Sequence, residues 1–226
     1  MTDQADGLRR LMAANTARRV ALVDGTSDSG ACSVAFNLAA ALTQQGRDVL
    51  LLDERNGPHP VPPARGGQLV LVDAVVDSDG ALSPLAAGAD HIVVVCTAST
   101  EAITRTYLCI KKLHYAHALA SLRVLVNEAA DPAQARRLLA NLASTGNRYL
   151  GMALEPAGFV RVDPFLAQAR RLNLSVVQAF RTSAAAQDFL QIASDLLTWP
   201  CPVAADRTPL SSQWAGHEIQ PLASLH

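Results

Sequence analysis

The sequence is poor in lysine, since Lys111 and Lys112 are the only lysines among its 19 basic residues. Its formal net charge is −1, so no bulk field would draw it to nucleic acid or to anionic lipid. No apolar run reaches the ~18 residues of a membrane-spanning helix, and the charged first residues lack the apolar centre of a signal peptide. These absences predict a cytoplasmic protein that binds neither nucleic acid nor membrane.

Metal and redox motifs are also missing. The four cysteines form no C-x-x-C pair, and three of them fall in segments typical of a core, so we expect reduced, buried thiols. His114 and His117 stand one helical turn apart, but no cysteine or carboxylate at a suitable spacing completes a metal site. The cysteines are Cys32, Cys96, Cys109 and Cys201.

The sequence is instead rich in apolar residues, which make up 50% of 226 residues and suffice for one well-buried domain. Runs of Val, Ile and Leu alternate with segments of helical period, which predicts a three-layer α/β/α fold with a mostly parallel sheet. Strands are expected at 20–23, 49–53, 69–73, 91–96, 122–127 and, shorter, 158–162. Helices are expected at 2–15, 31–45, 100–115, 132–144, 164–172 and 183–197. The proposed division is an N-terminal helix and linker (1–17), an α/β domain (18–198) and a loosely ordered tail (199–226).

A loop from Asp24 to Ser33 follows the first expected strand and precedes the first helix of the α/β domain. Strand, tight glycine-bearing loop and helix together form the frame of a phosphate-binding loop. A working loop of this kind also needs a lysine for the β/γ-phosphates and a Ser/Thr hydroxyl for Mg²⁺. No lysine stands in this loop, so the frame is present without the group that would bind the β/γ-phosphates.

Four stretches, in order over residues 18–197, resemble the MinD/ParA family of deviant phosphate-loop ATPases. They are 19–53, which includes the loop, 89–104, 124–127 ending at Asn127, and 158–184. The resemblance implies a MinD-type sheet, here shortened between its second and third strands to the Pro/Gly-rich connection 56–67. The shortening removes part of the surface through which the family dimerises around nucleotide, so we do not expect ATP-driven dimerisation.

The family alignment shows which site residues have changed. Its first lysine falls on Thr26, its phosphate-loop lysine on Ala31 and its Mg²⁺ hydroxyl on Cys32, while Gly25 and Gly30 keep the loop's glycine character. The family's second aspartate after strand two is replaced by Arg55. We therefore expect no ATP or Mg²⁺ cofactor and an inactive ATPase homologue; the alternative is an ATPase with weak nucleotide binding. The degenerate site comprises Gly25, Thr26, Gly30, Ala31, Cys32, Asp53, Asp73 and Asn127.

Two roles remain open for particular residues of this site. Asp73 matches the family's Walker-B-type aspartate, but a strand-end aspartate is as often a turn or helix cap. Asp28 and Ser29 are expected to turn the chain and to cap the helix that begins at Ala31.

The first residues resemble the flagellar-number regulators of this family, FlhG and FleN. Asp3-Gln4-Ala5 with Leu8-Arg9 is similar to their Asp-Gln-Ala-x-x-Leu-Arg motif. The resemblance implies that this segment docks on FlhF, a signal-recognition-particle-type GTPase, and stimulates GTP hydrolysis, with Gln4 acting in trans. The alternative is a capped helix packed on its own domain. The implied partner-binding residues are Asp3, Gln4, Ala5, Leu8, Arg9, Leu11 and Met12.

The resulting hypothesis is a non-enzymatic regulator of flagellar number or placement, recruited to the cell pole or flagellar base through its partner. A flagellar switch (C-ring) component or a transcription regulator is the alternative partner. A continuous arginine stripe would favour contact with DNA, whereas scattered arginine pairs would argue against it.

Overall fold

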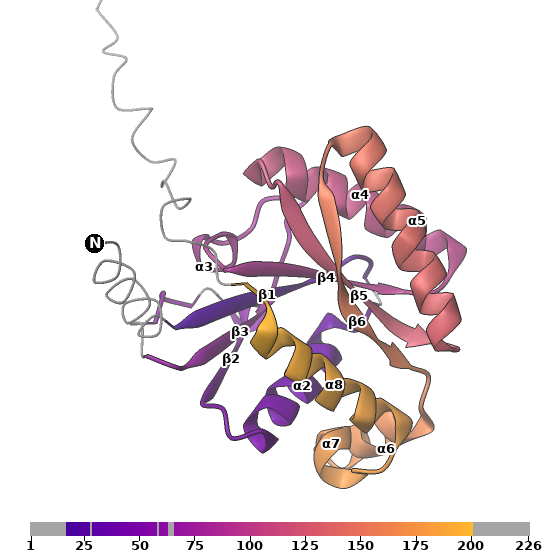
Figure 1. The fold of residues 1–226 in the computed structure, drawn as a ribbon. Helices are drawn as coiled ribbons and strands as arrows, with labels where there is room; N and C mark the ends of the chain where they lie inside the picture. Colours follow the sequence, from indigo (N-terminus) through magenta and orange to yellow (C-terminus); the bar gives the residue numbers. More distant parts are fainter. Residues whose placement is uncertain (1–16, 28, 58, 63–65, 201–226) are drawn as a thin grey trace, which may run out of the picture.

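The computed structural model describes residues 17–27, 29–57, 59–62 and 66–200. Six strands form one sheet in the order β2-β3-β1-β4-β5-β6, and every neighbouring pair runs parallel (Figure 1). The predicted parallel sheet is therefore confirmed. The strands are β1 (Arg18–Asp24), β2 (Val49–Asp53), β3 (Leu69–Ala74), β4 (His91–Thr97), β5 (Ser121–Ala129) and β6 (Ala153–Arg161).

Helices cover both faces of the sheet, which gives the three expected layers (Figure 1). Successive side chains of a strand point to opposite faces, so Val20 and Leu22 of β1 join the core under α2, α6, α7 and α8. Ala21 and Val23 join the core under α3, α4 and α5. The helices are α2 (Ala31–Gln44), α3 (Pro84–Ala87), α4 (Thr100–His117), α5 (Pro132–Leu150), α6 (Pro164–Arg171), α7 (Val176–Ala179) and α8 (Ala184–Thr198), with a 3₁₀ turn η1 (Glu54–Asn56).

Among the strands, the last one differs most from its predicted bounds, whereas the helix expected at 132–144 continues to Leu150. β6 begins at Ala153, five residues before the expected start, and contains Pro156. Proline has no backbone N–H, but β6 lies at the edge of the sheet, where a missing donor is tolerated. The pairing with β5 shifts register just after Pro156. α3 and α7 were not predicted, because four residues are too few to show a helical period.

The short connection after β2 is tied to the end of that strand. The side chain of Asp53 accepts hydrogen bonds from the Arg55 backbone N–H at 2.9 Å and from Asn56 Nδ2 at 2.9 Å. His59 Nε2 donates to the Asp53 carbonyl at 2.8 Å. This turn places Arg55 next to the ends of β3 and β1, and so determines the chemistry of the candidate site.

Trp199, which the sequence assigns to the tail, is packed at the amino ends of the strands and is 9% exposed. Its carbonyl accepts a hydrogen bond from Arg18 Nη2 at 2.7 Å, and its ring lies 5.2 Å from that of His91, edge to face. The guanidinium of Arg123 lies 4.2 Å above the Trp199 ring. We call Arg18, His91, Arg123 and Trp199 the amino-edge cluster.

Candidate functional site

The candidate site lies where β1, β2 and β3 end. These strands are neighbours and parallel, with Asp53 of β2 in register with Asp73 of β3 and Asp73 in register with Leu22 of β1. Asp24 follows two residues after Leu22, so three carboxylates gather at one edge of the sheet. A cleft of about 710 Å³ opens there between the first half of α2 and α6. Its lining residues include Asp24, Cys32, Phe36, Arg55, Leu166, Arg170 and Leu174.

The loop between β1 and α2 keeps its frame because neighbouring elements hold it. The Gly25 N–H donates to the Val95 carbonyl at 2.8 Å, and a Cβ at Gly25 would lie 2.7 Å from that oxygen. Gly30 has φ +78°, the left-handed region that favours glycine. Asn127 Nδ2, from the end of β5, donates to the Ser29 carbonyl at 2.9 Å. Gly25 and Gly30 thus lie within the loop, and Asn127 contacts the loop from β5.

Asp24 holds the start of α2. Its Oδ1 accepts hydrogen bonds from Ser29 Oγ at 2.5 Å and from the backbone N–H of Ala31, the first residue of the helix, at 2.9 Å. The N-cap residue, Gly30, has no side chain to make such a bond. The expectation that Ser29 caps the helix is therefore wrong, because its hydroxyl donates to Asp24. The Asp24 carboxylate lies at the positive end of the helix, where an anion is stabilised.

Arg55 places a positive charge between the carboxylates of β1 and β3. Its Nη2 forms a short ion pair with Asp24 Oδ2 and lies 3.7 Å from Asp73 Oδ1. Asp73 is 1% exposed, and neither of its carboxylate oxygens has a hydrogen-bond partner among the described residues. Asp73 therefore caps no turn or helix in the described structure. Arg55 is the cation that compensates this buried charge.

Burial and charge shift the titration of both groups. Burial raises the pKa of Asp73, and the positive charge of Arg55, followed by the nearby Cys32 thiol, offsets only part of that rise. Burial acts to lower the pKa of Arg55, but the charges of Asp73 and Asp24 raise it overall. Arg55 therefore stays protonated beside the two carboxylates.

Cys32 occupies the position that aligns with the Mg²⁺-binding hydroxyl. It is exposed, which corrects the expectation of a buried thiol at this position. Its pKa is raised by partial desolvation of the sulfur and then by the negative charge of Asp73, so the thiol stays neutral. Burial raises the pKa of Cys96 to about 12 and that of Cys109 to about 11, which leaves both inert. A neutral thiol is a poor ligand for a hard cation such as Mg²⁺.

The residues of this site do not fit a nucleotide with magnesium. The position nearest the first N–H of α2 holds the Asp24 carboxylate, which would repel a phosphate. The position between Asp24 and Asp73 holds the Arg55 guanidinium, which would repel a metal ion. Within the described ranges, no group of three or more His, Cys, Asp or Glu side chains is arranged to hold a metal.

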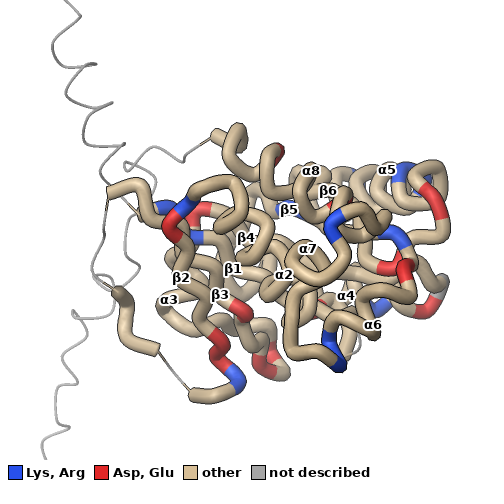
Figure 2. Tube along the Cα trace, turned by 90° about the horizontal axis from the view of Figure 1, so that it is seen from below, with Lys and Arg blue, Asp and Glu red and all other residues tan. Residues whose placement is uncertain are grey.

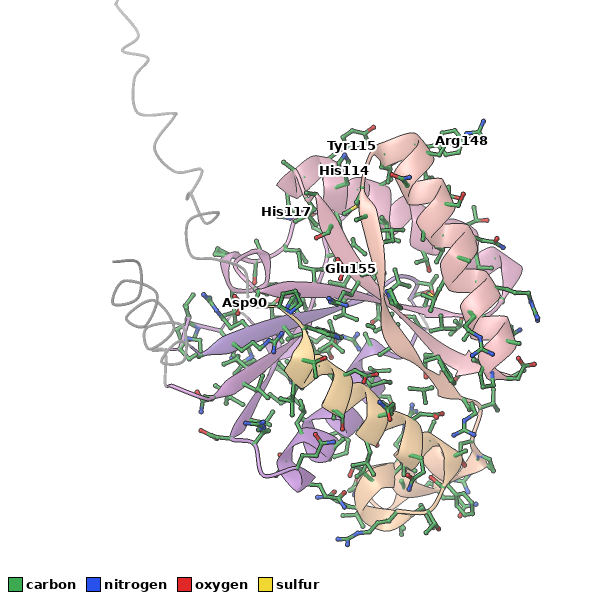
Figure 3. All side chains as sticks on the ribbon, in the orientation of Figure 1. Asp90, His114, Tyr115, His117, Arg148 and Glu155 are labelled. Carbon is green, nitrogen blue, oxygen red and sulfur yellow. The ribbon has the colours of Figure 1, made fainter. Side chains whose placement is uncertain are left out.

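The two histidines noted in the sequence are engaged elsewhere. His114 and His117 lie near the end of α4 (Figure 3). His117 Nε2 accepts from the Leu82 N–H at 3.0 Å, and His114 Nδ1 donates to the Leu119 carbonyl at 2.8 Å. Each ring therefore fixes a loop at this end of the molecule.

Charges of both signs are spread along the chain. In the view of Figure 2, blue Lys/Arg segments and red Asp/Glu segments are interspersed, with no continuous blue stripe. None of the helices in the described ranges has both the length and the apolar character of a membrane span. For the part of the chain that the structure describes, this view thus shows no arginine stripe of the kind that DNA contact would favour.

The predicted partner-binding residues Asp3, Gln4, Ala5, Leu8, Arg9, Leu11 and Met12 lie outside the described residues. Sequence reasoning missed Asp24 and Arg55 as members of the site. Arg55 was noted only as a missing aspartate, because its reach depends on the strand order β2-β3-β1. The signals available in the sequence were Arg55, two residues after β2, and Asp24, the last residue of β1.

Comparisons with known proteins agree with this fold. No family model matches the chain. The chain is 33% identical over 134 residues to the antiactivator FleN of Pseudomonas aeruginosa, a match that spans 59% of this chain and about half (48%) of FleN. Its fold is similar to the MinD cell division protein of Aquifex aeolicus, with a TM-score of 0.61 and 16% identity over 83% of this chain and 99% of MinD. A ParA family ATPase of Chlorobium tepidum gives a TM-score of 0.55 and 13% identity over 80% of this chain and 99% of its own. The chain therefore has the MinD/ParA fold and is similar in sequence to FleN.

Proposed function

We propose that this chain is a non-enzymatic regulator of flagellar number or placement, which acts on a GTPase of the FlhF type through its first residues. One contrast supports the proposal: the Asp3-Gln4-Ala5 motif is intact, whereas the phosphate loop has lost both lysines and its metal-binding hydroxyl. At the same loop, Asp24 and Arg55 occupy the positions that a phosphate and a cation would need. A chain that no longer hydrolyses nucleotide can still activate a partner that does.

The proposed mechanism needs only one polar side chain in the partner's active site. The amide of Gln4 can donate and accept a hydrogen bond, so it can orient a water molecule for attack on a γ-phosphate. Leu8, Leu11 and Met12 would anchor the segment in an apolar groove of the GTPase. Because Gln4 acts on the transition state, its loss should reduce turnover more than binding.

The test is GTP turnover by FlhF in the presence of the full chain, as wild type and as the variant Gln4→Ala. We expect the wild type to stimulate turnover, and Gln4→Ala to lose most of that stimulation while its Kd for FlhF changes little. Gln44→Ala, at an exposed position at the end of α2, is the matched control and should stimulate like the wild type. Equal stimulation by Gln4→Ala, or none by the wild type, would refute the proposal.

A second candidate function is inhibition of a transcription activator, because the relative FleN is named an antiactivator. On this alternative the chain binds an activator protein and lowers its output. The discriminating experiment is transcription from a flagellar promoter with Gln4→Ala in place of the wild type. Repression that survives this change would favour the antiactivator role, whereas altered flagellar number with unchanged promoter activity would favour action on the GTPase.

A further inference from the structure

We propose that Asp24 and Arg55 form a resident ion pair that takes the place of a phosphate and a cation in this loop, and so holds the loop in one state without any ligand. The inference goes beyond the proposed function, because it concerns what fixes the loop and requires no partner GTPase. It rests on one mismatch. The strand, loop and helix have the arrangement of a phosphate-binding loop, but the Asp24 carboxylate and the Arg55 guanidinium occupy the positions of the phosphate and the cation.

The anionic half of the pair is the Asp24 carboxylate. It lies at the N-terminus of α2 and uses the backbone N–H of Ala31, a group that an incoming phosphate would need. It also accepts the Ser29 hydroxyl, so both ends of the segment 29–31 are bound to one carboxylate. A phosphate could reach these donors only by displacing a like charge that is covalently part of the loop.

The cationic half is the guanidinium of Arg55. It connects Asp24 at the end of β1 with Asp73 at the end of β3. Asp73 is an independent indication of a cation site, because its buried carboxylate has no hydrogen-bond partner among the described residues. An uncompensated buried carboxylate is costly. The buried Asp73 carboxylate therefore needs a counter-charge independently of the loop, and Arg55 provides it.

The pair also links three elements of the site mechanically. Arg55 belongs to η1, whose start is fixed by the Asp53 side chain. Asp24 joins β1 to the first turn of α2, and Asp73 is the last residue but one of β3. The ends of all three neighbouring strands and the start of α2 are thus connected through two side chains of opposite charge. A loop held in this way needs no nucleotide to define its conformation.

The first experiment measures amide hydrogen exchange of the full chain at residues 29–36. In Arg55→Gln we expect exchange at the first turn of α2 to rise about tenfold, because Asp24 loses its counter-charge. Arg170→Gln is the matched control, since Arg170 lines the same cleft on α6 and should leave this exchange unchanged. Arg55→Lys, which keeps the charge if Arg55→Gln fails to fold, should be intermediate. Wild-type exchange in both Arg55 variants would overturn the proposal.

The second experiment tests the charges by thermal unfolding. Arg55→Gln should lower the midpoint of thermal unfolding. The double variant Arg55→Gln/Asp73→Asn should recover at least half of that decrease, because a neutral amide in place of the Asp73 carboxylate needs no cation. Losses that simply add would contradict the cation role. Mg-ATP, Mg²⁺ alone and inorganic phosphate should each leave the wild-type midpoint unchanged. A saturable rise with any of them would show that the loop accepts a ligand and would overturn the inference, whatever the result with FlhF.

Discussion

Arginine has different roles at the two ends of the strands, which we call the amino edge and the carboxyl edge of the sheet. At the carboxyl edge, Arg55 compensates Asp24 and Asp73 beside a cleft of about 710 Å³. At the amino edge, Arg18 donates to the Trp199 carbonyl and Arg123 packs over the Trp199 ring, beside a hollow of about 100 Å³. Arg55 therefore compensates carboxylates beside an open cleft, whereas Arg18 and Arg123 close the end of the core around an aromatic side chain, with Arg123 also paired to Glu155.

This difference follows from what each edge must accommodate. In α/β folds, ligands bind outside the carboxyl ends of the strands, so this edge keeps polar groups and an open cleft. The amino edge has no such requirement and can be closed by packing. We therefore expect loss of buried packing at the amino edge to cost more stability than loss of a polar contact at the carboxyl edge, and the predictions below test that order.

Trp199→Ala should have the largest effect on stability. The side chain is almost completely buried, so its truncation removes apolar contacts and leaves a cavity, at a cost of about 3–5 kcal/mol. The loss also removes the cation–π contact with Arg123. Urea unfolding of the full chain would measure it. Tyr149→Ala, on an exposed side chain of α5, should stay within about 0.5 kcal/mol of the wild type. A comparable loss in both variants would show that Trp199 is not part of the core.

Asp24→Ala should come second, with a loss of about 2–3 kcal/mol. It removes the acceptor for Ser29 Oγ and the Ala31 N–H, and it leaves Arg55 with Asp73 alone. The same urea titration measures this change, with Asp79→Ala, at an exposed position after β3, as the matched control. If Asp24→Ala costs no more than Asp79→Ala, the loop does not depend on this carboxylate.

The elements of the fold could be predicted because each carries a local signal. β2 was predicted with its observed bounds, Val49–Asp53, because a run of Val and Leu ending in Asp is typical of a parallel strand. α2 was predicted to within one residue, from its apolar period and from the glycine after it. The start of β6 was not predicted, since Pro156 argues against a strand unless the strand is known to lie at an edge.

The site was predicted only in part, because its chemistry depends on contacts between distant residues. The loss of both lysines could be seen in the sequence, and so could the loop glycines. The reach of Arg55 to Asp24 could not, since the two residues are separated by 31 positions and meet only through the strand order. Trp199 was likewise assigned to the tail, because a lone aromatic residue before two prolines shows no periodicity.

Asn127→Ala should have a smaller effect than Asp24→Ala, about 1–2 kcal/mol. Asn127 makes one hydrogen bond to the loop, from Nδ2 to the Ser29 carbonyl, but the side chain is buried and no water would readily replace it. Thermal unfolding should show the loss, and hydrogen exchange should place it at the loop. Asn141→Ala, at an exposed position on α5, provides the comparison. A loss equal to that of Asp24→Ala would mean that the hydrogen bond from Asn127 to the loop stabilises the carboxyl edge as much as the Asp24 carboxylate does.

The smallest predicted effect is a pH dependence at the amino edge. Burial, together with the charges of Arg18 and Arg123, lowers the pKa of His91 from 6.5 to about 4, so the folded ring stays neutral and accepts from Arg18 Nη2 at 3.1 Å. Between these two pH values the unfolded chain binds a proton that the folded chain does not. This contribution to stability is therefore complete above pH 6.5 and is lost as the pH falls toward 4. Because the ring is only half-buried, screening by solvent reduces the effect to about 1 kcal/mol.

His91→Gln keeps an acceptor for Arg18 but cannot titrate, so its stability should depend less on pH over this window. The raised pKa of Asp73 acts in the opposite direction at the carboxyl edge, because acid there favours the folded state. Since Asp73 is present in both proteins, the difference between the wild-type and His91→Gln urea midpoints, followed from about pH 7 to about pH 4, isolates the amino edge. A difference that does not change with pH would show that His91 is not held neutral by the amino-edge cluster.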